Sequence, residues 1–301
     1  MVLEIKNLSK SFGEKKVIDK ISFTCSSGIA TGLLGRNGAG KTTTIRTILG
    51  IISRDGGEVL LDGKPLPSYY SPVGYLPEER GMYPKMKIEE QLVYFATLRN
   101  MPVKDARKSL DYWLERLEMT EYRGKKFEVL SKGNQQKIQL IGALLHNPDI
   151  VVLDEPFSGL DPVNALLLKS VVLELISKNK LVVFSSHQMN YVEDFCQEVV
   201  MIDKGQLVLD GNLNKIKQSY DRNSLFVRVR RSDKDITPLF DIPGVIEAKK
   251  HNNGYMVSLK REELCGSVLA NLTNNGVDID DFHLVELTLN DIFIQKVGEQ
   301  A

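Results

Sequence analysis

The stretch TGLLGRNGAGKTTTIRTILGII, residues 31–52, joins an apolar run, a glycine-rich turn and apolar residues at helical spacing. Together they predict a buried strand, a tight loop and an amphipathic helix in direct succession. Residues 35–42 fit the pattern G-x-x-x-x-G-K-S/T. In this context the glycines let backbone N–H groups close around a polyphosphate at the helix N-terminus, where the helix dipole favours anions. The stretch therefore predicts a phosphate-binding loop.

The side chains of this loop have separate predicted roles. Lys41 adds a positive charge at the β- and γ-phosphates of a nucleotide, and the hydroxyl of Thr42 is placed to bind Mg²⁺. The loop residues predicted to contact the nucleotide are Gly35, Asn37, Gly38, Gly40, Lys41, Thr42 and Thr43.

A second motif, IVVLDEP at residues 150–156, ends an apolar strand on two carboxylates. We expect Asp154 to hold Mg²⁺ through water. Glu155 would lie beside the γ-phosphate and orient or deprotonate an attacking water. A simple turn at the strand end is the alternative, which the pairing with the phosphate-binding loop disfavours.

The pattern of apolar and polar residues changes several times along the rest of the chain. Short β-like runs fill residues 2–34 and a hairpin pattern fills 56–66, whereas residues 87–146 contain three amphipathic helical stretches. Strands and helices then alternate, as in a mostly parallel, covered sheet. From residue 221 a strand of strict alternation, a hairpin with Asn253-Gly254 as its turn, a helix, a strand and a final helix follow. The fold class is therefore α/β, with an antiparallel β subdomain, a helical insertion and a small C-terminal α+β domain.

Bulk composition names no partner. The 301 residues contain 39 basic and 39 acidic side chains, so no net field draws the chain to nucleic acid or anionic lipid. No run approaches the roughly 18 apolar residues of a membrane span, and the N-terminus lacks a signal-peptide pattern. The three cysteines are too far apart for a zinc site and favour a reducing compartment.

Three further motifs carry a family resemblance. LSKGNQQK at residues 130–137 resembles the signature motif of the ATP-binding cassette (ABC) ATPases. SGLDP at residues 158–162 resembles their D-loop, and His187 after LVVFSS resembles their switch histidine. With the phosphate-binding loop (P-loop) and IVVLDEP, the resemblance covers residues 2 to about 215. It implies an ATP-binding domain over 1–220, with its helical subdomain at about 87–146, and an accessory domain over 221–301.

The resemblance implies a site shared between two cassettes, which face each other with two ATP molecules between them. Ser131 and Gly133 would contact the γ-phosphate bound by the opposite subunit, and Asp161 would couple the two sites. Phe12 would stack on adenine, with a plain turn-packing aromatic as the alternative. Glu155 and His187 would be catalytic, and ATP and Mg²⁺ are the implied cofactors.

The chain departs from the family pattern at two places. Its signature reads Ser-Lys-Gly-Asn where Ser-Gly-Gly-Gln is usual, which keeps the serine and the second glycine. In VGYLPEERG, residues 73–81, Glu78 takes the position of the Q-loop glutamine. An anionic side chain there can still coordinate Mg²⁺, so hydrolysis is still expected. Glu79 and Arg80 are expected to face solvent or a partner protein.

The resemblance implies the ATPase subunit of an ABC exporter that dimerises on ATP and drives a separate membrane permease through its helical lobe and Q-loop. The second cassette would be another copy or a paralogue, no nucleic acid is expected as a partner, and the chain would lie at the cytoplasmic face of the membrane. Two alternatives stay open: a soluble ABC-type ATPase in translation or DNA repair, and a nucleotide-regulated scaffold. The sequence does not reveal the transported substrate or the role of the C-terminal domain.

Overall fold

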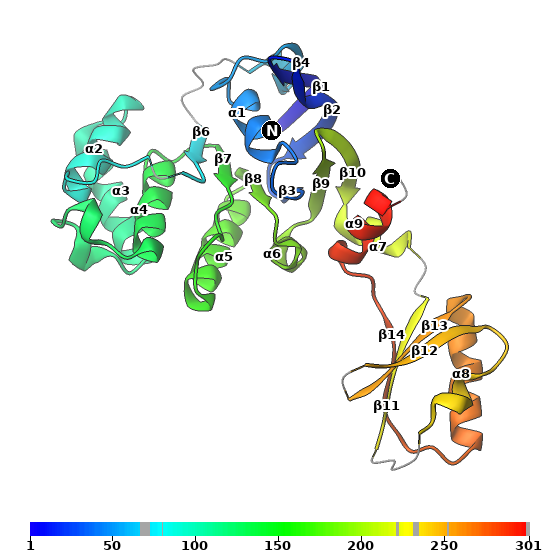
Figure 1. Cartoon of the computed structure of the whole chain (residues 1–301). Helices are drawn as coiled ribbons and strands as arrows, with labels where there is room; N and C mark the ends of the chain where they lie inside the picture. The colour runs from blue at the N-terminus through cyan, green and yellow to red at the C-terminus, as the bar shows by residue number, and fades with distance from the viewer. Residues whose placement is uncertain (67–72, 80, 221–222, 231–234, 252, 299–301) are drawn as a thin grey trace. The chain divides into compact units, whose positions relative to one another are not determined.

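The computed structural model describes residues 1–66, 73–79, 81–220, 223–230, 235–251 and 253–298 (Figure 1). The chain divides into two compact units, Met1–Leu213 and Asn214–Ala301. This border lies at helix α7 (Leu213–Gln218), a few residues before the border expected from the sequence pattern at 220/221.

A six-stranded sheet forms the centre of the first unit, with the strand order β10-β9-β3-β8-β7-β6. Neighbouring strands are parallel except for β10, which pairs antiparallel with β9. Every residue of β3, β7 and β8 is buried, which explains their continuous apolar sequences. The strands are β3 (Ala30–Leu34), β6 (Val73–Leu76), β7 (Ile150–Asp154), β8 (Leu181–Ser186), β9 (Glu198–Asp203) and β10 (Gln206–Asn212).

Helix α1 (Lys41–Ile48) follows β3, α5 (Pro162–Ser177) connects β7 to β8, and α6 (Met189–Phe195) connects β8 to β9. Because parallel strands place their carboxyl ends at one edge of a sheet, the loops after β3, β7 and β8 meet there. The phosphate-binding loop, Asp154-Glu155 and His187 follow these strands.

A second, antiparallel sheet has the order β2-β1-β4-β5. One apolar cluster joins the two sheets, with Leu3 and Ile5 of β1 packed in the same core as Val183 of β8 and Val200 of β9. The strands are β1 (Val2–Phe12), β2 (Lys15–Ser26), β4 (Gly56–Leu61) and β5 (Lys64–Pro65).

A helical lobe lies between β6 and β7 in the chain and consists of α2 (Ile88–Leu98), α3 (Val103–Arg116) and α4 (Lys132–Leu144) (Figure 1). Each helix buries an apolar stripe at helical spacing, for example Ala106, Leu110 and Trp113 of α3. None of the described helices is long and apolar enough to cross a membrane.

A polar cluster joins the helical lobe to α5. Arg116 Nε donates to Glu174 Oε2 at 3.0 Å and Arg116 Nη2 to Ser170 Oγ at 2.9 Å, while Tyr112 and Lys178 also donate to Glu174. Burial alone would raise the pKa of Glu174, but hydrogen bonds from Lys178, Tyr112 and Arg116 outweigh it and lower this pKa. The ionised carboxylate of Glu174 therefore holds α3 of the helical lobe against α5.

The second unit contains a four-stranded antiparallel sheet with the order β12-β13-β11-β14. Helix α8 covers one face, where Val268 and Leu272 pack on Leu225, Val227 and other core residues of the sheet. The elements are β11 (Ser224–Val229), a 3₁₀ turn (Thr237–Phe240), β12 (Val245–His251), β13 (Gly254–Leu259), α8 (Cys265–Asn274), β14 (Ile279–Val285) and α9 (Leu289–Gly298).

The predicted hairpin forms from β12 and β13, but the prediction that Gly254 lies in its turn is wrong. Gly254 is the first residue of β13 and pairs with His251, so it belongs to the ladder and not to the centre of the turn. The reason for a glycine here is close packing: a Cβ at Gly254 would lie 2.6 Å from the Val227 oxygen and 2.7 Å from the Phe226 ring.

Candidate functional site

The loop between β3 and α1 has a backbone that only glycine can adopt. Gly35 has φ 154°, and a Cβ there would lie 2.2 Å from the carbonyl oxygen of Ile202. Gly40 has φ 108° and is the N-cap of α1, which begins at Lys41. The first N–H groups of α1 therefore have no intrahelical acceptor and face the loop, as an anion site requires.

Lys41 is nearly buried beneath this loop. Its Nζ donates to the carbonyl oxygen of Gly35 at 2.9 Å and lies 3.1 Å from Glu155 Oε1. Both side chains are only 6% exposed. A buried ammonium placed against backbone oxygens and one carboxylate can also bind a phosphate oxygen at the same end of α1.

Asp154 ends β7 and is fully buried. Its Oδ1 accepts hydrogen bonds from Ser185 Oγ at 2.5 Å and Thr42 Oγ1 at 3.2 Å. Its Oδ2 accepts none from the described part of the chain. Burial raises the pKa of Asp154, and the bonds from Ser185 and Thr42 only partly offset the rise. A buried carboxylate oxygen without a partner, beside a threonine hydroxyl, fits a hard divalent cation such as Mg²⁺.

Glu155 follows with φ 48°, an unusual value for a residue other than glycine. Its N–H donates to Ser185 Oγ at 2.9 Å, and its Oε2 accepts from His187 Nδ1 at 2.8 Å. Because the carboxylate can only accept, Nδ1 carries the proton and Nε2 is left for other partners. The strained backbone of Glu155 is thus found at a residue whose carboxylate is held between Lys41 and His187, as is common at functional sites.

Lys41, Thr42 and Glu155 open onto a pocket of about 520 Å³, whereas Asp154 and His187 are not among the described residues that line it. Eight of the ten lining residues were predicted site residues, and Lys15 and Val17 of β2 were not predicted. Phe12 pairs with Lys15 in the hairpin of β1 and β2, and its ring is half exposed. The lining residues are Lys15, Val17, Asn37, Gly38, Gly40, Lys41, Thr42, Thr43, Glu78 and Glu155.

Ser131, Gly133 and Asp161 are not among the described residues that line this pocket. Ser131 is the N-cap of α4, and its Oγ accepts from the N–H of Asn134 at 3.3 Å. Asp161 is the N-cap of α5 and accepts from the N–H of Asn164 at 2.9 Å. Both residues thus begin helices, so they stabilise the N-termini of α4 and α5 within one chain.

In the segment after β6, Glu78 and Glu79 have different surroundings. Glu78 lines the pocket, whereas the side chain of Glu79 is 86% exposed and lies 4.0 Å from Arg46. Arg80 lies outside the described residues.

Comparisons with known proteins identify the family. The ABC transporter family model matches residues 18–158. The ABC transporter ATP-binding protein YhaQ of Bacillus subtilis, itself uncharacterised, is 44% identical over 298 residues, 99% of each chain. This chain belongs to the ATP-binding proteins of ABC transporters. It is accordingly an ABC-type ATPase, and ATP is its nucleotide. A second family model, the C-terminal domain of DrrA1-3-like ATP-binding proteins, matches residues 211–297 of this ABC ATPase.

Two further similar proteins support the same family. The lipopolysaccharide export system ATP-binding protein LptB of Haemophilus influenzae is 29% identical over 222 residues, covering 71% of this ABC ATPase and 92% of LptB. A solved structure of the ATP-binding subunit of an ABC transporter has a TM-score of 0.68 and 28% identity, and it covers 73% of this chain and 93% of the other. The predicted fold class, an α/β P-loop cassette with a helical insertion, is therefore confirmed.

Sequence reasoning missed Ser185. Its hydroxyl bonds both the Asp154 carboxylate and the Glu155 N–H, because parallel pairing of β7 with β8 sets Asp154 opposite Ser185. A serine inside the apolar strand LVVFSS was the available signal, since a buried hydroxyl needs a partner.

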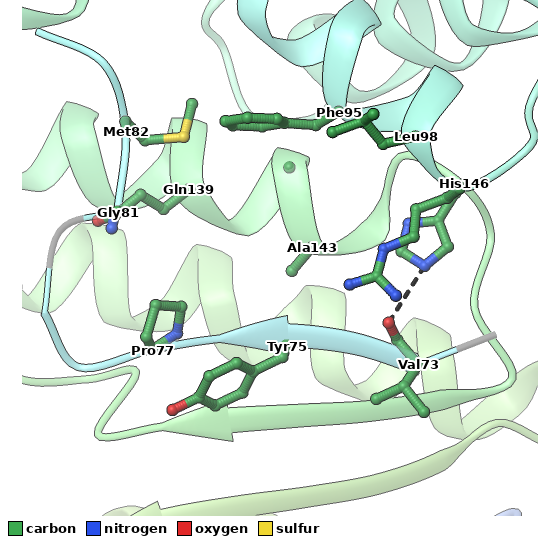
Figure 2. Close-up of a pocket in the computed structure, with 12 residues that line it drawn as sticks. Val73, Tyr75, Pro77, Gly81, Met82, Phe95, Leu98, Gln139, Ala143 and His146 are labelled. Carbon is green, nitrogen blue, oxygen red and sulfur yellow. Dashed lines mark hydrogen bonds between the residues drawn. The ribbon is translucent and has the colours of Figure 1, made fainter. Parts of the chain in front are cut away.

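A groove of about 250 Å³ lies where β6, α2 and α4 of this ABC ATPase meet (Figure 2). Figure 2 shows Met82, Phe95 and Leu98 along one side, with Val73 and Tyr75 of β6 opposite. His146 Nε2 lies 3.3 Å from the carbonyl oxygen of Val73, which can only accept, so Nε2 carries the proton. Burial and then the charge of Arg99 lower the pKa of His146. The groove thus combines apolar side chains with Arg99 and Gln139 and has a neutral histidine at one end.

Proposed function

We propose that this ABC ATPase binds Mg²⁺ with ATP in the 520 Å³ pocket, dimerises on ATP, and powers export through a separate membrane permease. The observation that carries the proposal is the buried chain of contacts from Thr42 through Asp154 and Ser185 to Glu155 and His187. This chain links the carboxylate of Asp154, which would bind the cation, to the carboxylate of Glu155, which would act as the base. Both lie next to the phosphate-binding loop.

Within one site, the loop N–H groups and Lys41 bind the β- and γ-phosphates. Thr42 and Asp154 hold Mg²⁺, with Glu78 at the pocket wall as a further oxygen donor. When bound, the cation neutralises charge on the phosphate oxygens. Glu155 orients or deprotonates the attacking water, and His187 fixes the direction of its carboxylate through the 2.8 Å bond. Phe12, half exposed and paired with the lining residue Lys15 in the hairpin of β1 and β2, stacks on adenine.

The second half of the site comes from another cassette. Ser131, Gly133 and Asp161 begin or follow helix N-termini but do not line the pocket of their own chain among the described residues. This placement supports a dimer in which they act on the ATP of the opposite subunit, either a second copy or a paralogue.

The permease docks in the groove between β6 and the helical lobe. Leu98 is 61% exposed at this groove, and Tyr94 of α2 and Tyr83 of the segment before α2 are also exposed, a pattern typical of a protein interface. Gln139 of α4 donates to the carbonyl oxygen of Glu79 at 3.5 Å, so the groove is linked to the segment that carries Glu78. This arrangement would hold the chain at the cytoplasmic face of the membrane, and the export system named for LptB supports the direction of transport.

The test is affinity purification from detergent-solubilised native membranes. Glu155→Gln removes the base while keeping the shape of the side chain and holds the ATP-bound dimer, so we expect a polytopic membrane protein in stoichiometric amount. Lys41→Ala, which removes the phosphate contact, is the control and should recover less of the dimer. Ribosomes or DNA-repair factors in place of the membrane protein would instead favour the soluble ATPase.

A further inference from the structure

The segment that follows Glu155 is held by contacts from three directions. Glu155 has φ 48°, and the next two residues, Pro156 and Phe157, are buried. The N–H of Glu155 donates to Ser185 Oγ at 2.9 Å, which fixes the beginning of the segment to β8. A residue other than glycine keeps a positive φ only where its surroundings hold it there. The contacts of Pro156 and Phe157 therefore bear on the orientation of Glu155.

An aromatic cluster holds the far end of this segment. The Phe157 ring stacks on Tyr191 of α6, with ring centroids 4.5 Å apart and an interplanar angle of 13°. It also packs against Phe184 of β8 at 5.8 Å and Phe195 of α6 at 5.5 Å. Phe157, Phe184 and Phe195 are all buried. The cluster thus ties the end of the segment to β8 and α6, which both belong to the sheet.

The middle of the segment is held from the helical lobe. Gln136 of α4 donates through Nε2 to the carbonyl oxygen of Pro156 at 2.7 Å. Among the residues that the structure describes, it is the only donor to this oxygen. Gln136 and Pro156 also line a small cavity that α4 shares with α5. Its volume of about 10 Å³ is at the lower limit for a single water, so the amide of Gln136 satisfies this carbonyl.

The helix that carries Gln136 begins at the signature motif, with Ser131 as its N-cap. Gly133, in the first turn, lies against α5, since a Cβ there would be 3.4 Å from Asn164 Nδ2. Gln136 follows three residues later, about one turn further along the helix. The first two turns of α4 therefore contact the sheet unit both at α5 and at the segment after Glu155.

We propose that Gln136 is a positioning residue for Glu155: it holds the Pro156 carbonyl from the helical lobe and so fixes the backbone immediately after the base. This role rests on the function proposed above for Glu155, which orients or deprotonates the attacking water. Without the bond, the Pro156 carbonyl loses its donor and the strained φ of Glu155 can relax. A displacement of about 1 Å at a reacting group can cost about a hundredfold in rate. The phosphate-binding loop is not touched by this change.

Steady-state ATP hydrolysis by the full chain tests this role. Gln136→Met keeps the length of the side chain and removes the donor. Lys137→Met is the matched control, because Lys137 lines the same cavity from the same helix. We expect Gln136→Met to lower kcat by about tenfold with KM for ATP within about twofold of wild type, and Lys137→Met to keep both within about twofold. Thermal unfolding of the nucleotide-free variants establishes that each is folded at the assay temperature.

A double-mutant cycle with Glu155→Gln separates positioning of the base from a general loss of stability. In single-turnover hydrolysis, Gln136→Met should lower the residual rate of Glu155→Gln by less than about twofold, because the group that it positions is already absent. Gln136→Glu is a second variant of nearly the same shape, whose ionised carboxylate cannot donate. Its kcat should fall as that of Gln136→Met does.

Two results would overturn the role of Gln136 alone. One is a kcat for Gln136→Met and Gln136→Glu that equals that of Lys137→Met. The other is an equal loss from Gln136→Met with and without the Glu155 carboxylate. An unchanged kcat in Glu155→Gln would instead refute Glu155 as the base, and the role of Gln136 with it.

Discussion

Ser185→Ala is the sharpest test of the site, because this hydroxyl holds both carboxylate residues. Ser185 Oγ donates to Asp154 Oδ1 at 2.5 Å and accepts from the N–H of Glu155 at 2.9 Å, in a fully buried position. The substitution removes a bond to a charged group and leaves the Glu155 N–H without an acceptor. It creates only a small cavity.

The expected loss follows from these two bonds. A hydrogen bond to a charged group contributes about 1.5–3 kcal/mol, and an unsatisfied buried donor costs about 1–3 kcal/mol. The two effects share one oxygen and are not additive, so we expect the free energy of unfolding to fall by about 3 kcal/mol. ATP turnover should fall by about tenfold or more, since the orientation of the Glu155 carboxylate is no longer fixed.

Ser186→Ala is the matched control. Ser186 is equally buried and follows Ser185 in the same strand, but within the described part of the chain its hydroxyl hydrogen-bonds only the backbone of Gln188, at 2.9 and 3.2 Å. Urea unfolding of the nucleotide-free protein and steady-state ATP hydrolysis should show a loss of about 1 kcal/mol and unchanged turnover for this control. If Ser185→Ala behaves like Ser186→Ala in both assays, the linking role of Ser185 is refuted.

Three further substitutions test other parts of the molecule. The pKa of Asp154 is raised above its ordinary 3.8, so its contribution to stability is present below pH 3.8 and lost as pH rises through the folded value. Asp154→Asn should therefore unfold at a higher temperature than wild type at pH 7 while losing Mg²⁺-dependent hydrolysis; a lower unfolding temperature would contradict this. The pKa of Glu174 is lowered from 4.5, so its stabilisation is present above pH 4.5 and lost as pH falls through the folded value. Glu174→Gln should cost about 1–2 kcal/mol at pH 7, and a difference from wild type in urea unfolding that does not shrink below pH 4.5 would refute the role of its charge. Leu98→Glu, at a 61% exposed position, should leave thermal unfolding unchanged but abolish co-purification of the permease, and retention of the permease would exclude the groove as its docking site.

The elements that were predicted well from the sequence are those that depend on residues close together in the chain. The phosphate-binding loop is a strand, a turn and a helix in one stretch, and its glycines are dictated by local φ values and close backbone approach. The three helices of the lobe repeat their apolar residues at helical spacing, so their existence followed from periodicity. The exception was the Asn253-Gly254 turn, where contact with Phe226 and not turn geometry requires the glycine.

By itself, then, the sequence determined the cassette, its phosphate loop and the chain positions of its acidic and histidine residues, because each motif is read within a few neighbouring residues. Only the tertiary structure decided that Ser185 joins Asp154 to Glu155, since that contact spans 31 residues and depends on the register of β7 and β8. The rows of residues across the C-terminal sheet likewise arise from pairing between four strands. Strand register is set by packing over the whole core, and no local pattern contains it.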